Sequence, residues 1–129
     1  IVCGLHYGEL RGETRALDLI ADLDPSLVVI LSLMNLPGTP MATVAPPAPA
    51  AVAEMIVETR LRLPAAALSL GCARPRGRER LEVLAVEAGV NRMALPSEEA
   101  RQRAADFGLD IEYRRTCCSV LRGPAEAPW

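Results

Sequence analysis

Four cysteines are the residues of this 129-residue chain whose type most directly suggests chemistry. Cys3 and Cys72 each end an apolar run, whereas Cys117 and Cys118 are adjacent near the carboxyl end. Thiolates are soft ligands that suit iron-sulfur clusters, so all four are candidate metal ligands. A single cysteine in a strand is also often a small buried hydrophobe, and a reactive tail is the alternative for the adjacent pair.

Arginine occupies every second position from residue 74 to residue 80. A guanidinium at the end of a strand could hold a carboxylate or contact a metal cluster. Arg74 is the favoured candidate because of its position at the predicted strand end. For Arg78 and Arg80 a solvated helix start is the better interpretation, and Arg76 stays undecided between the two.

A glycine-rich turn follows Cys3, with glycine at positions 4, 8 and 12. Such a turn lets the backbone approach a ligand closely. His6 is the only histidine, so no histidine-based zinc site or catalytic triad can form around it alone. The candidate ligand-binding residues of this turn are Gly4, His6, Tyr7 and Gly8, with a plain polar loop as the alternative for His6.

The apolar pattern alternates between short aliphatic runs and longer amphipathic stretches, which predicts repeated β-α units with parallel strands. Gly89 and Gly108 are predicted to end helices, and Ser97 to begin one. A polar, strand-like segment covers residues 110–115. The predicted strands are residues 1–3, 27–33, 66–70 and 92–95.

A proline-rich loop follows the second predicted strand, over residues 34–49. In barrels and open α/β sheets, the loops after the carboxyl ends of the strands build the ligand site. Cys3, this loop and Cys72 all follow such ends. We therefore expect them to converge on one edge of the sheet.

Composition excludes several classes of function. Half of the residues are apolar, which is enough for one hydrophobic core. The net charge of −2 gives no positive electrostatic field that would attract nucleic acid. No apolar run reaches 18 residues, so neither a membrane span nor a signal peptide is predicted. We expect a cytoplasmic protein whose cysteines, in a reducing compartment, are free thiols or metal ligands.

Three sequence blocks occur in a recognisable order. Residues 2–13 contain Val-Cys-Gly and the glycine-rich turn, residues 36–41 read Leu-Pro-Gly-Thr-Pro-Met, and residues 58–91 contain Leu-Gly-Cys-Ala-Arg and Ala-Gly-Val-Asn. Together they resemble the carboxy-terminal half of biotin synthase and its relatives among the radical S-adenosylmethionine enzymes. The resemblance covers most of the chain.

The resemblance implies a fold and a set of cofactors. The fold is α/β, namely the carboxy-terminal half of a TIM-type (β/α) barrel with about four parallel β-α units over residues 1–116, followed by a cysteine-containing tail over residues 117–129. S-adenosylmethionine is expected near Gly4, His6, Tyr7, Gly8 and Arg74. An auxiliary iron-sulfur cluster is expected on Cys3, Cys72, Arg74, Cys117 and Cys118.

These candidate ligands have different support. Cys3 and Arg74 fall on a cysteine and an unusual arginine that ligate the auxiliary cluster in biotin synthase. Cys72 and the adjacent pair Cys117 and Cys118 are not biotin synthase features. They resemble biotin synthase-like proteins that include a two-component type of lipoyl synthase.

The activity implied is sulfur insertion into an unactivated C–H bond of a small-molecule or lipoyl-type acyl substrate. The Cys-x-x-x-Cys-x-x-Cys segment that holds the family's 4Fe-4S cluster does not occur in this sequence. We therefore expect a missing amino-terminal half of the barrel. Exposed sheet edges predict a need for that half, a second subunit or a homodimer. Two alternatives stay open: a non-catalytic iron-sulfur-binding partner subunit and a metal-free (β/α) barrel enzyme.

Overall fold

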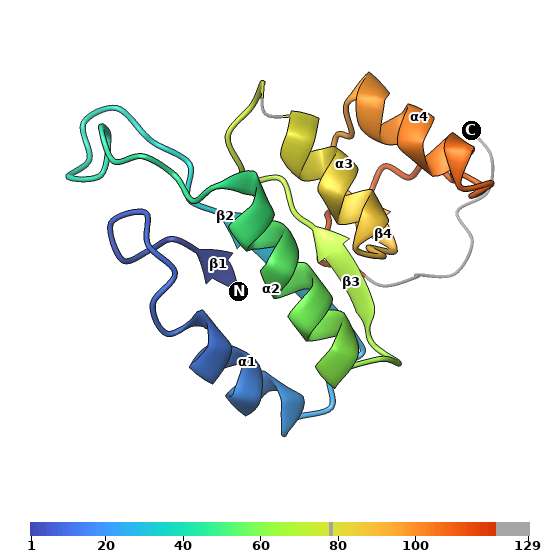
Figure 1. The fold of residues 1–129 in the computed structure, drawn as a ribbon, viewed down its shortest axis with the longest axis horizontal. Helices are drawn as coiled ribbons and strands as arrows, with labels where there is room; N and C mark the ends of the chain where they lie inside the picture. The colour runs from blue at the N-terminus through green and yellow to red at the C-terminus, as the bar shows by residue number, and fades with distance from the viewer. Residues whose placement is uncertain (78, 121–129) are drawn as a thin grey trace.

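Strands and helices alternate along the chain in the computed structural model, which describes residues 1–77 and 79–120 (Figure 1). No helix among these residues is long and apolar enough to cross a membrane. The strands are β1 (Val2–Cys3), β2 (Leu27–Ser32), β3 (Ala67–Leu70) and β4 (Arg92–Met93). The helices are α1 (Glu13–Ala21), α2 (Pro49–Arg62), α3 (Glu79–Glu87) and α4 (Glu98–Asp106).

The strands form one parallel sheet in the order β1-β2-β3-β4. Figure 1 shows α1, α2 and α3 side by side on the same face of this sheet. Sequential strand order with all crossovers on one side is the winding of a barrel, whereas a doubly wound sheet carries helices on both faces. The α/β fold with parallel strands is confirmed, and closure into a barrel stays a prediction.

The core lies between the sheet and the helices. Val28 and Ile30 of β2 are in register with Leu68 and Leu70 of β3, and all four side chains are buried. The predicted apolar faces of the helices cover them. The helices contribute Leu17, Val52, Met55, Ile56, Leu81 and Ala85 to this core.

The predicted helix ends are confirmed. The Ser97 side chain accepts a hydrogen bond from the backbone nitrogen of Ala100 at 3.2 Å, which caps the start of α4. Gly89 and Gly108 have φ angles of 82° and 65°, the left-handed conformation in which a helix commonly stops.

Three of the predicted strands differ from the observed ones by a single residue, and two segments differ by more. β4 ends at Met93, two residues earlier than expected, because Leu95 takes a φ of 48° and the chain turns there. Residues 110–115 form no strand and run as an irregular segment towards the tail. Regular hydrogen bonding needs a neighbouring strand, and the polar residues of this segment pack against none.

The described part of the tail returns to the sheet on the face opposite the core. Val29, Ser69 and Arg92 are in register on neighbouring strands and alternate with the core residues. The Arg92 guanidinium donates to the carbonyl of Val120 on this face. Residues 121–129 of the predicted tail lie outside the described residues.

Shortening Ile30 to alanine should destabilise the fold, because its side chain is fully buried between β2 and the helices. A core truncation of this kind costs about 2–5 kcal/mol in free energy of unfolding. Urea denaturation followed by circular dichroism measures the loss. Leu61→Ala on α2 is the matched control, because Leu61 is 76% exposed. Equal losses for the two variants would contradict this core.

Candidate functional site at the carboxyl edge of the sheet

Backbone from three strands meets at the carboxyl edge of the sheet, which we call the rim and define as residues 3–4, 32–34 and 71–74. The backbone nitrogen of Leu33 donates to the Cys3 carbonyl at 2.8 Å, and that of Ser32 donates to the Ala73 carbonyl at 3.0 Å. The segments after β1 and β3 therefore lie on either side of the end of β2. This confirms the predicted convergence of their backbones.

The glycine-rich turn and the proline-rich loop pack against each other beside the rim. Gly4 and Gly8 both have a φ of 88°, and a Cβ atom would collide with Pro47 at the first and with the Ala45 carbonyl at the second. The loop is closed on itself by the Asn35 amide, which donates to two carbonyls at 2.7 Å each. Glycine is thus required at both positions, because the Pro47 ring lies against Gly4 and the Ala45 backbone lies against Gly8.

The side chains between these two glycines point to solvent. Tyr7 is 67% exposed and takes a φ of 51°, which is uncommon for a residue other than glycine. His6 is also exposed, and its Nε2 lies 3.0 Å from an Arg11 guanidinium nitrogen. The structure brings Gly4, His6, Tyr7 and Gly8 into one turn, and their role in cofactor binding stays a prediction.

Cys3 lies in the hydrophobic core and is fully buried. Burial, and next the nearby Glu13 carboxylate, raise the pKa of the Cys3 thiol to about 11. The thiol is therefore protonated at neutral pH, whereas a metal ligand is a thiolate. Its side chain packs with residues of the helices, so Cys3 in this conformation is a core residue and its role as a ligand stays a prediction.

Glu13 links α1 to the glycine-rich turn. Its Oε1 accepts a hydrogen bond from the Gly4 backbone nitrogen at 2.8 Å, although the residue is only 7% exposed. Its Oε2 is buried and has no hydrogen-bond partner among the described residues. The carboxylate thus holds the turn in place from the start of the helix, and it adds to the negative field around Cys3.

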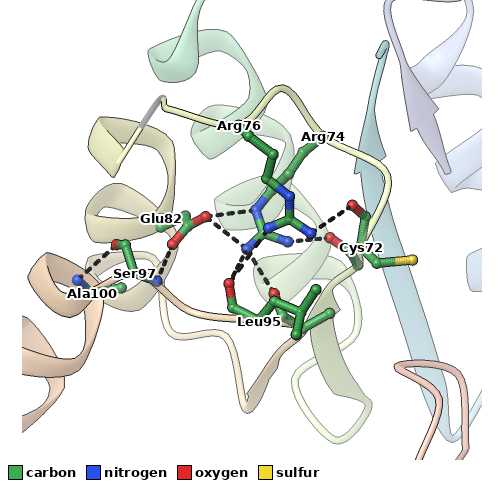
Figure 2. A network of polar contacts seen from close by, with 9 residues as sticks. Cys72, Arg74, Arg76, Glu82, Leu95, Ser97 and Ala100 are labelled. Carbon is green, nitrogen blue, oxygen red and sulfur yellow. Dashed lines mark hydrogen bonds and ion pairs between the residues drawn. The ribbon is translucent and has the colours of Figure 1, made fainter. Parts of the chain in front are cut away.

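Arg74 is fully buried at the centre of a polar network (Figure 2). Its Nε and Nη2 donate to Oε1 of Glu82 at 3.0 and 2.7 Å. Nη2 also donates to the carbonyls of Ala94 and Leu95 at 2.7 and 3.1 Å, and Nη1 to that of Gly71 at 2.5 Å. One guanidinium thereby joins the segments after β3 and β4 to helix α3.

Glu82 completes this network and was not among the predicted site residues. Burial by itself would raise the pKa of its carboxyl, but the hydrogen bonds from the Ser97 backbone and from Arg74 lower the pKa below its usual value. Its Oε2 accepts from the Ser97 nitrogen at 2.6 Å, which ties α3 to the cap of α4. The only signal in the sequence was an acidic residue in the first turn of a helix eight positions after Arg74.

Cys72 and Arg76 flank Arg74 and are both exposed. Figure 2 shows the Cys72 thiol directed away from the Arg74 guanidinium. Arg76 makes only long contacts, 3.4 Å to the Cys72 carbonyl and 3.5 Å to that of Leu95. Of Cys72, Arg74 and Arg76, Arg74 is the buried residue, and Cys72 carries an accessible thiol.

The tail brings its two cysteines to the same end of the sheet. Burial raises the pKa of Cys118, and Cys72 lies near enough to influence that pKa. Cys117 is exposed, and hydrogen bonds led by the Ser119 hydroxyl, 3.3 Å from its sulfur, lower its pKa. Of the predicted ligands, Cys72 and Cys118 therefore lie near each other, and Cys117 precedes Cys118 in the chain.

The predicted ligands do not form a ready iron-sulfur site. In residues 1–77 and 79–120, no group of three or more histidine, cysteine, aspartate or glutamate side chains is arranged to hold a metal ion. Cys3 is directed into the core, and Arg74 is occupied by its own hydrogen bonds. Only the thiols near Cys72 have the exposure and the chemistry that such a cluster requires.

Comparison with known proteins finds a relative among the biotin synthases. The chain is 29% identical over 136 residues to a protein named biotin synthase from Halorhodospira halophila. The alignment covers 94% of this chain but 42% of the bacterial protein, so the chain spans less than half of that relative's length. No protein-family model matches the chain, and no solved structure matches it.

The four thiols should differ in their rate of alkylation. At pH 7.5 a thiol with a pKa of about 11 is ionised in roughly one molecule in 3,000, so Cys3 should react slowest, and the exposed Cys117 should react fastest. Iodoacetamide labelling of the metal-free protein, read by peptide mass spectrometry, measures these rates. Labelling in urea is the control, since unfolding should bring the rates together. Equal rates in the folded protein would refute the assigned environments.

Replacing Gly8 by alanine should loosen the turn from the proline-rich loop. The new Cβ meets the Ala45 carbonyl, and such overpacking costs about 1–3 kcal/mol in stability. Gly12→Ala is the matched control, because its φ of 105° is equally unsuitable for alanine but its Cβ would meet nothing within 4 Å. The difference in melting temperature between the variants reports the contact, and no difference would argue against it.

Proposed function

We propose that this chain is the carboxy-terminal part of a radical S-adenosylmethionine enzyme that inserts sulfur into an unactivated C–H bond, as expected for a biotin or lipoyl synthase-like protein. The observation that carries the proposal is the similarity to biotin synthase along 94% of the chain. The parallel sheet with helices on one face supports it, because it suits a segment of a (β/α) barrel.

The residues of this chain would contribute binding and positioning. Between Gly4 and Gly8 the exposed residues, with the Tyr7 hydroxyl, would be available to a nucleoside ligand beside the rim. Helices α1 to α3 shield the core face of the sheet from water. S-adenosylmethionine and iron-sulfur clusters, when bound, would supply the radical and redox chemistry.

The missing partner in this scheme is the segment that generates the radical. We propose that it lies in an amino-terminal half of the barrel, either in the same polypeptide or in a second subunit. β1 and β4 end the described sheet, and each offers unpaired backbone groups to a further strand. A homodimer is the other arrangement that would cover these edges.

The complete reading frame should form 5′-deoxyadenosine when it is purified anaerobically, reconstituted with iron and sulfide, and incubated with S-adenosylmethionine and dithionite. Mass spectrometry measures the nucleoside. Alanine variants of the Cys-x-x-x-Cys-x-x-Cys segment expected upstream are the control and should form none. A reading frame without that segment that forms no deoxyadenosine even with a partner subunit would refute the proposal and leave the metal-free barrel.

A further inference from the structure

We propose that Arg74 is a structural clamp that holds the rim together and that it does not ligate the auxiliary iron-sulfur cluster. The clamp does not rest on the proposed function.

The hydrogen bonds of Arg74 use all three guanidinium nitrogens. Nε and Nη2 donate to the Glu82 carboxylate, Nη1 donates to the Gly71 carbonyl, and Nη2 donates in addition to the carbonyls of Ala94 and Leu95. A guanidinium carries five N–H donors and no acceptor. Each nitrogen therefore already directs hydrogen towards protein oxygen, and none offers a lone pair to a metal.

The electrostatics of the pair also oppose ligation. The side chains of Arg74 and Glu82 are 1% and 8% exposed, so their charges neutralise each other in a site with little water. A metal bond would require a guanidine nitrogen that has lost its proton. Loss of that positive charge would leave the Glu82 carboxylate buried without a counterion, which is strongly destabilising.

The clamp is tested by a double-mutant cycle on melting temperature in the complete protein. Arg74→Met and Glu82→Leu should each lower it by on the order of 10 °C, since each leaves one buried charge unpaired. The double variant should recover at least half of the summed loss, because an apolar pair leaves no charge. Arg76→Met, an exposed neighbour, is the control and should change little. Additive losses without recovery would overturn the clamp.

The absence of a bond from Arg74 to iron is tested by iron content and pulsed electron paramagnetic resonance after anaerobic reconstitution. The double variant should keep the iron content of the unmutated protein. Arginine labelled with ¹⁵N in the guanidine group should give no strong hyperfine coupling. Strong coupling, or loss of iron from a folded double variant, would overturn the assignment.

Failure of this inference can be separated from failure of the proposed function. Formation of 5′-deoxyadenosine is measured in the unmutated protein and reports the radical-generating cluster. If the nucleoside forms but the melting-temperature cycle shows additive losses, the clamp is overturned while radical chemistry stands. If no nucleoside forms, the proposed function fails, and the melting-temperature cycle still decides whether Arg74 is a clamp.

Discussion

The rim depends on one buried positive charge. Taking a guanidinium out of water is costly unless an opposite charge and several acceptors replace its hydration, and Arg74 obtains both from Glu82 and from three backbone carbonyls. These partners come from the end of β3, from α3 and from the turn after β4. The need to satisfy one side chain therefore determines how the last two β-α units meet.

This constraint also explains where β4 ends. A strand can continue only while its carbonyls face a neighbouring strand, but the carbonyls of Ala94 and Leu95 turn towards Arg74. The positive φ of Leu95 is the local consequence. Glu82 then carries the connection to the amino end of α4 through Ser97, so a single polar network reaches across α3, β4 and α4.

The cysteines lie in different environments because helices α1 to α3 cover only one face of the sheet. Cys3 belongs to the face packed by helices, where loss of water keeps its thiol protonated. Cys72 lies past the end of its strand, where no helix covers it, and the tail crosses the opposite face to bring Cys117 and Cys118 nearby. Of two predicted ligands at strand ends, Cys3 is therefore buried and Cys72 is exposed.

The sequence by itself determined the order of strands and helices, the parallel sheet, the cap at Ser97 and the convergence of the rim segments, because periodicity, helix caps and strand direction are local signals. It did not determine what Arg74 contacts. The sequence does not predict how the chain turns between Arg74 and Glu82. A buried arginine and a metal-ligating arginine also look the same in a sequence. Only the tertiary structure decides between them, since it shows which oxygen atoms surround the guanidinium and which way the neighbouring thiol points.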